Sequence, residues 1–113
     1  MTEEAGMPSP FECQVESRRD VVSVCPVGEL DIATVGEVDA QLAEVRQAGF
    51  DRLLLDLRET TFIDSSGLRL AVAWHKRSHR ERFVFALVQG PDAVRHVFKM
   101  TGLIGRLTFL DPE

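Results

Sequence analysis

The sequence lacks the features that mark several large classes of protein. It has only 2 Cys among 113 residues, which are too few for a disulfide scaffold and have no zinc-ligand spacing. It has no apolar run near the roughly 20 residues that span a bilayer. Its 13 Lys and Arg are outnumbered by 18 Asp and Glu, whereas nucleic-acid backbones select basic surfaces. These absences disfavour a membrane partner and direct nucleic-acid binding.

What remains is the composition of one ordinary globular domain. Hydrophobic residues make up 44% and charged residues 27%, enough for a core without metals or disulfides. Residues 1–10 are polar and acidic and predict a flexible N-terminal tail before a domain over residues 11–113. The tail has no apolar segment of the kind that a signal peptide carries. We therefore expect a cytoplasmic protein whose thiols stay reduced.

The first part of the domain is predicted to be a β-hairpin. Phe11, Cys13 and Val15 alternate with polar residues, as in a half-buried strand. A β-branched run over residues 21–27 follows a polar turn and supplies the second strand. The parity of the apolar positions places Cys13 and Cys25 on opposite faces of this hairpin, so two free thiols are expected.

Strands and helices alternate in the rest of the chain. Buried strands are predicted for residues 52–57, 82–88 and 107–110, and helices for residues 35–48, 68–74 and 91–101, with a turn over residues 60–67. Thr34 and Glu37 have the spacing of a capping box. The buried stripes are predicted to be Val35, Val38, Leu42 and Val45 in the first helix, and Ala93, Val94, Val97, Phe98 and Met100 in the third. The order β-β-α-β-α-β-α-β predicts an α/β fold with a mostly parallel sheet and helices packed against it.

The most informative stretch is Asp64-Ser65-Ser66-Gly67, between a buried strand and a basic helix. Helix N-termini at the carboxyl ends of parallel strands are places where anions and ligands bind. An exposed hydroxyl and free amides at this point could receive a phosphate. From spacing alone, the plainer interpretation is that Ser65 or Ser66 caps the helix.

Catalytic and metal-binding interpretations fit this region less well. Ser65 has only half of the glycine pattern of a hydrolase nucleophile elbow, and the possible bases His75, His79 and His96 are not forced near it. A small serine hydrolase is therefore a remote alternative. His75 and His79 have the spacing of metal ligands, but the residues between them are basic and oppose a cation. We expect no metal and no cofactor, because the P-loop and dinucleotide fingerprints are also absent.

Three segments in order resemble a STAS domain of the anti-sigma-factor antagonist, or anti-anti-sigma factor, type. They are Gly-Glu-Leu-Asp at residues 28–31, Phe-Ile-Asp-Ser-Ser-Gly-Leu at 62–68 and Val-Phe-Lys-Met-Thr-Gly-Leu at 97–103. The resemblance covers about residues 11–110. It implies a bacterial, non-enzymatic regulator that binds an anti-sigma factor and frees a sigma factor for transcription. It also implies that the anti-sigma factor is an ATP-dependent serine kinase that phosphorylates Ser65, and that a phosphatase resets the site.

The same resemblance implies which residues meet the partner. These are Asp31, Asp64, Ser65, Ser66, Gly67 and Arg69. A phosphate on Ser65 would meet like charge from Asp31 and Asp64 at a close interface and weaken binding. Arg69 stands where the family often has glycine. A cation there could attract the phosphate or alter the choice of partner, or it could be a solvated helix residue.

The end of the chain departs from the usual pattern of the family. The family usually has a further helix after the last strand, which residues 111–113 are too short to form. Apolar side chains from Phe11, Val22, Val24 or Phe109 are then expected to lack cover, which predicts a homodimer or a monomer of low stability.

The alternative function is a STAS scaffold or transport-complex subunit that is not phosphorylated.

Overall fold

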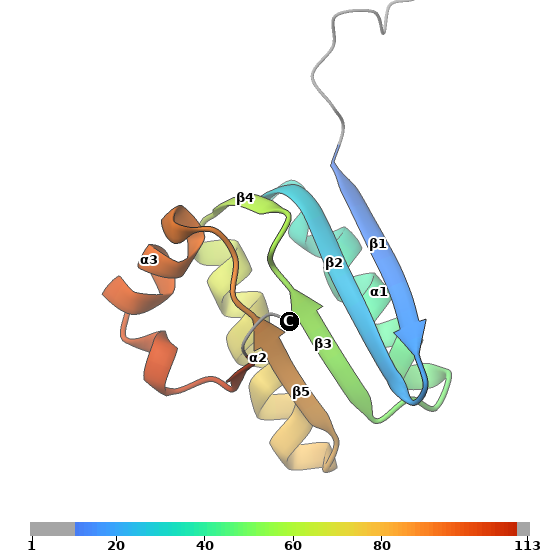
Figure 1. Cartoon of the computed structure of the whole chain (residues 1–113). Coiled ribbons are helices and arrows are strands. Elements are labelled where there is room, and N and C mark those ends of the chain that lie inside the picture. The colour runs from blue at the N-terminus through green and yellow to red at the C-terminus, as the bar shows by residue number, and fades with distance from the viewer. Residues whose placement is uncertain (1–10, 111–113) are drawn as a thin grey trace, which may run out of the picture.

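Residues 11–110 are the part of the chain that the computed structural model describes, and they form a sheet backed by helices (Figure 1). The strands are β1 (Glu12–Arg18), β2 (Val21–Leu30), β3 (Arg52–Asp56), β4 (Thr60–Ile63), β5 (Val84–Val88) and β6 (Phe109–Leu110). The helices are α1 (Val35–Gln47), α2 (Ser65–Glu81) and α3 (Asp92–Met100), followed by the 3₁₀ turn η1 (Leu103–Gly105). No helix in this described part is long and apolar enough to cross a membrane.

The sheet has the strand order β1-β2-β3-β5-β6, and β4 pairs with the last part of β2. The hairpin of β1 and β2 is antiparallel, whereas β2, β3, β5 and β6 run parallel to one another. Parallel neighbours need a long connection, and helices provide it here. The predicted α/β fold, with a mostly parallel sheet and an N-terminal hairpin, is confirmed.

Strand β4 replaces part of the turn that was expected over residues 60–67. Its 4 residues are too few for a period of two to stand out in the sequence. Tertiary contacts hold it instead, because Thr60 is fully buried and its Oγ1 donates to the Pro26 carbonyl at 3.0 Å. Helix α2 consequently begins at Ser65, earlier than the predicted Leu68.

Helices α1 and α2 cover one face of the sheet (Figure 1). Their buried apolar side chains are Val38, Leu42 and Val45 on α1 and Leu70, Ala71 and Trp74 on α2. They belong to one core with the buried strand residues Val22, Val24, Leu53, Leu55, Phe85 and Leu87. These strand residues occupy every second position, because successive side chains point to opposite faces. The stripe predicted for the first helix is confirmed, with Val35 only half-buried at its start.

Helix α3 buries a narrower stripe than the sequence predicts. Val94 and Phe98 are buried and Val97 is half-buried. Ala93 and Met100 are exposed, so the prediction is wrong for these two. The reason is that α3 lies at the end of the sheet and packs with one side against β4 and η1.

The two cysteines are free thiols on opposite faces of the hairpin, as predicted. Cys13 is the register partner of Pro26, and Cys25 is the register partner of Gln14. Burial, reinforced by nearby carboxylates, raises the pKa of each thiol to about 11. Both groups therefore stay protonated at neutral pH, and a protonated thiol is a poor nucleophile.

The expectation of uncovered side chains is wrong for two of the four residues named. Val22 and Val24 are 2% and 0% exposed, because they point toward α1 and α2. Phe11 and Phe109 are half-buried. The face of the sheet that has no described helix on it is the opposite one (Figure 1). Side chains on this face alternate along the strands with those of the core.

This helix-free face, the face that carries Leu54, Asp56 and Val88, has a depression of about 790 Å³. Asp56 lies in it and is almost fully buried. Arg58 donates to its carboxylate from Nη2 at 2.7 Å and from Nε at 3.0 Å. Burial on its own raises the pKa of Asp56, but the hydrogen bonds from Arg58 outweigh it and hold the pKa below its usual value.

Substituting the neighbouring residues Leu54 and Leu55 of β3 compares the packing of the two faces of the sheet. Leu55 is 0% exposed beneath the helices, whereas Leu54 is half-buried on the helix-free face. We expect Leu55→Ala to lower the free energy of unfolding by about 2–5 kcal/mol, and Leu54→Ala to lower it by less than half of that. Urea unfolding of both variants measures the difference. Equal losses would mean that both faces are equally packed.

The Asp56–Arg58 pair predicts a pH dependence of stability. A carboxyl whose pKa is lowered by folding stabilises the fold above its unfolded pKa of about 3.9, and this is lost as pH falls through the folded value. The loss of stability in Asp56→Asn should therefore be large at pH 7 and shrink toward pH 3. The trend is measured against that of Asp51→Asn, which removes a carboxylate at an exposed position. A constant difference for Asp56→Asn across this range would contradict the prediction.

Candidate functional site

Two of the predicted site residues, Asp31 and Asp64, directly follow the ends of two neighbouring strands. Leu30 at the end of β2 and Ile63 at the end of β4 are register partners in parallel strands. Asp31 and Asp64 follow them directly, and the Asp64 amide donates to the Leu30 carbonyl at 3.3 Å. The carboxyl ends of two strands thus bring Asp31 and Asp64 to the same edge of the sheet, where α2 begins.

Asp64 is the residue that caps α2. Its Oδ1 accepts hydrogen bonds from the amides of Ser66 at 2.8 Å and Gly67 at 3.4 Å. The interpretation that Ser65 or Ser66 caps the helix is therefore wrong. The expectation of free amides is wrong for these two as well, because the Asp64 carboxylate already occupies them.

The two adjacent serines differ in their access to solvent. Ser65, the first residue of α2, is exposed, whereas Ser66 is 8% exposed. A helix turns by about 100° per residue, so neighbours on it face different ways. Among these two hydroxyl groups, only that of Ser65 is open to an enzyme or a partner.

Gly67 sets how closely the start of α2 approaches the sheet. A Cβ at this position would lie 2.6 Å from Cγ1 of Ile63 and 3.1 Å from Cγ of Leu30. Gly67 is also buried, so it offers a partner little surface. Its absent side chain instead allows the first turn of α2 to lie directly on the ends of β2 and β4.

The loop after β2 is held by its own side chains. The Thr34 hydroxyl donates to the Glu29 carbonyl at 2.7 Å and accepts from the Asp31 amide at 2.9 Å. Asp31 Oδ1 accepts from the Ala33 amide at 3.0 Å. Helix α1 begins after Thr34 as predicted, but Thr34 makes no side-chain cap bond. The predicted capping box with Glu37 is wrong because the Thr34 hydroxyl is already used within the loop.

Two exposed apolar side chains flank this edge of the sheet. Ile32, next to Asp31, is 73% exposed, and Phe62, two residues before Asp64, is 49% exposed. Ile32 lies outside the three family motifs, and Phe62 is noted only as part of one of them, because an isolated apolar residue is normally assigned to the core. Large apolar side chains gathered at one exposed edge are typical of a surface that binds protein.

Arg69 is exposed one turn after Ser65 on α2. It makes no ion pair or side-chain hydrogen bond with another described residue. Further along α2, Arg77 and Arg80 both contact Glu81, at 3.1 and 3.7 Å. Arg69 therefore differs from these arginines in having its charge available at the site.

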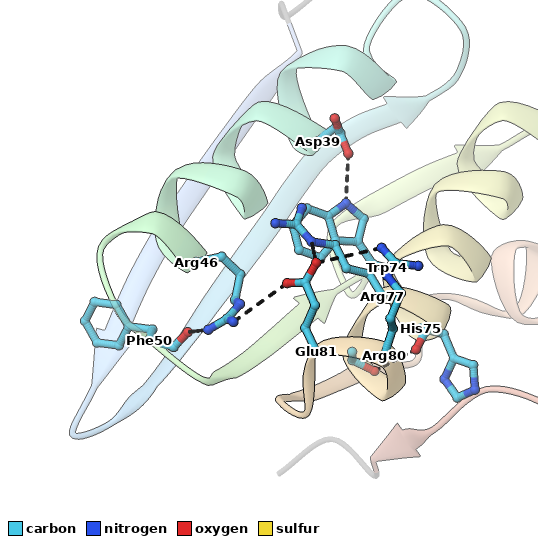
Figure 2. A network of polar contacts seen from close by, with 9 residues as sticks. Asp39, Arg46, Phe50, Trp74, His75, Arg77, Arg80 and Glu81 are labelled. Carbon is cyan, nitrogen blue, oxygen red and sulfur yellow. Dashed lines mark hydrogen bonds and ion pairs between the residues drawn. The ribbon is translucent and has the colours of Figure 1, made fainter.

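The second half of α2 is fixed against α1 by a polar network (Figure 2). Trp74 Nε1 donates to Asp39 at 2.8 Å, and the Arg77 guanidinium lies 4.5 Å from the centre of the Trp74 ring. Glu81 also pairs with Arg46 of α1 at 3.8 Å. This network holds the direction of α2, and thereby the position of its first residue, Ser65.

His75 and His79 lie on α2 well beyond Ser65. His75 and His79 contact each other, with ring centroids 4.6 Å apart, and His75 lies about 15 Å along the helix from its start. Burial and the neighbouring His79 lower the pKa of His75. No third His, Cys, Asp or Glu joins this pair within residues 11–110. The pair therefore supplies neither a base for Ser65 nor a three-ligand metal centre.

Sequence comparisons link the chain to known regulators. The family model described as STAS domain matches residues 12–111. The anti-sigma-B factor antagonist of Staphylococcus aureus (strain NCTC 8325 / PS 47) is 32% identical over 76 residues, which are 67% of this chain and 70% of that protein. The protein of the same name from Staphylococcus epidermidis is 30% identical over the same length.

Solved structures share the fold. An anti-sigma factor antagonist from Mycobacterium paratuberculosis aligns with a TM-score of 0.79 and 25% identity over 88% of this chain and 85% of that one. The unphosphorylated anti-sigma factor antagonist SpoIIAA aligns with a TM-score of 0.74 and 25% identity over 90% and 89%. The phosphorylated form of the Bacillus protein SpoIIAA aligns with a TM-score of 0.69 and 24% identity over 90% of this chain and 92% of that one, a similarity of fold. The chain therefore belongs to the STAS-domain family, alongside these anti-sigma factor antagonists.

Proposed function

We propose that the chain is an anti-sigma-factor antagonist that is switched by phosphorylation of Ser65. The observation that carries the proposal is the exposed Ser65 at the capped start of α2, at the edge of the sheet where the strands that precede Ile32 and contain Phe62 end. The names of the curated relatives support the first part. SpoIIAA, whose structure resembles that of this chain, has a phosphorylated form, and this supports the proposed phosphorylation.

The proposed binding surface combines apolar and charged groups at one edge of the sheet. Ile32 and Phe62 would be covered by the anti-sigma factor, and burying a large apolar side chain fully contributes about 1.5–3 kcal/mol. Asp31, Ser65 and Arg69 supply the polar contacts around them. Binding here removes the anti-sigma factor from its sigma factor, which is then free to act in the bacterial cytoplasm.

The proposed switch acts through charge at this surface. The anti-sigma factor acts as a kinase and transfers the γ-phosphoryl group of ATP to Oγ of Ser65, with loss of the hydroxyl proton and release of ADP. The phosphate adds about −1.5 to −2 charge close to Asp64, and Asp31 lies at the same edge. At a closed interface this group loses its solvation and meets like charge, so the partner dissociates. A phosphatase restores the hydroxyl by hydrolysis, and the chain itself performs no catalysis.

Phosphorylation of the chain is expected at Ser65 and not at Ser66. Incubation with the cognate anti-sigma factor and Mg-ATP should add one phosphate to the wild-type chain, as measured by intact mass. Ser66→Ala should still gain it, since Ser66 is 8% exposed, whereas Ser65→Ala should not. Phosphate mapped to Ser66 alone would overturn the assignment. No gain in any form would favour a STAS scaffold that is not phosphorylated.

A negative charge at position 65 is expected to weaken binding of the anti-sigma factor. Ser65→Asp should bind the anti-sigma factor at least about 10-fold more weakly than Ser65→Ala, since 1.4 kcal/mol of repulsion is sufficient for that factor. Isothermal titration calorimetry measures both affinities. Ser17→Asp places the same charge on β1, at the other end of the hairpin, and should bind like the wild type. Equal affinities for the two Ser65 variants would show that the site is not the switch.

A further inference from the structure

The amides of Ser66 and Gly67 in the first turn of α2 are already hydrogen-bonded, so they are not free to bind a phosphate on Ser65. Helix N-termini bind anions through amides that have no partner within the helix. Here the Asp64 carboxylate accepts from the amides of Ser66 and Gly67, at 2.8 and 3.4 Å. The same carboxylate adds negative charge directly beside Ser65. The phosphate therefore needs a counter-charge from outside the first turn.

Arg69 is placed to supply that charge. Residues 65 and 69 are four apart on one helix, so their side chains lie on the same face. Side chains on a helix also lean toward its N-terminus, which directs Arg69 back over Ser65. Both residues are exposed. The residue three after Ser65 is Leu68, which is half-buried and carries no charge.

The charge of Arg69 is also uncommitted within the described part of the chain. Arg77 and Arg80, further along the helix, contact Glu81, and Arg58 is bound to Asp56. No such contact with a described residue is found for Arg69. An exposed arginine without a carboxylate partner can turn to a new anion without breaking an existing ion pair.

We propose that Arg69 is the intramolecular counter-ion of the phosphate on Ser65, an inference that rests on the proposed phosphorylation of this residue. The planar guanidinium donates two hydrogen bonds to phosphate oxygens, which lysine cannot match in geometry. The pair has the acidic group N-terminal to the basic one, the favourable order on a helix. Phosphorylation then has two effects on the surface. It adds a phosphate, and it engages the Arg69 side chain, which is no longer available to contact the partner.

The test uses the full chain with phosphoserine incorporated at position 65 during synthesis, so that neither kinase nor partner is needed. Phosphorus NMR follows the second ionisation of the phosphate against pH. A nearby cation favours the doubly charged form, so the phosphate pKa should be lower in the wild type than in Arg69→Gln, by at least about 0.3. Arg69→Lys, which keeps the charge without the planar fork, should lie between them.

Lys76→Gln is the matched control. It removes one positive charge from an exposed position on the same helix, about 16 Å along the helix from Ser65, which is beyond a Debye length at physiological salt. It should leave the phosphate pKa at the wild-type value. If Arg69→Gln and Lys76→Gln give the same pKa, the proposal is wrong. That outcome would leave the proposed function standing, because the latter depends on the affinities of the Ser65 variants.

Discussion

The bond between the Asp64 carboxylate and the first turn of α2 is the contact on which the site depends. Oδ1 of Asp64 accepts from two amides of that turn, while the Asp64 amide donates to the end of β2 at Leu30. Capping satisfies N–H groups that the helix itself cannot bond. One aspartate thus joins the sheet to the helix and fixes the position of the next residue, Ser65, at the surface.

The residues around this bond make the site rigid. Gly67 lets α2 lie against Ile63 and Leu30, and the Thr34 hydroxyl ties the neighbouring loop to β2. The network between α1 and the second half of α2 fixes the other end of the helix (Figure 2). A partner that binds at the proposed site would meet a preformed surface, so binding would lose little free energy to ordering loops. On such a surface a single added phosphate can change affinity without a change of fold.

Elements with a clear hydrophobic period could be predicted from the sequence, and elements held by tertiary contacts could not. The apolar run of β3 and the stripe of α1 are local patterns, and their alternation is sufficient to predict a mostly parallel sheet. Strand β4 has no such pattern, because it depends on pairing with β2 and on the buried hydroxyl of Thr60. The capping box failed for a related reason, since the Thr34 side chain bonds to the preceding loop instead.

The candidate site was found as a motif, but its geometry needed the fold. The stretch Asp64–Gly67 identified the start of a helix, yet only the packing of α2 decides that Ser65 is exposed and Ser66 buried. Ile32 and Phe62 carry no sequence signal of exposure. Their positions on the surface follow from the way that β2 and β4 end at the same edge of the sheet.

If a phosphate on Ser65 controls binding to an anti-sigma factor without unfolding the chain, the modified and unmodified chains should differ in affinity but share one fold. The most direct measurement is the affinity of the anti-sigma factor for the unmodified chain and for the chain carrying phosphoserine at position 65, together with the circular dichroism and melting temperature of each. We expect binding at least about 100-fold weaker after phosphorylation, equivalent to roughly 2.8 kcal/mol, with the fold retained. Equal affinity of the two forms would contradict it.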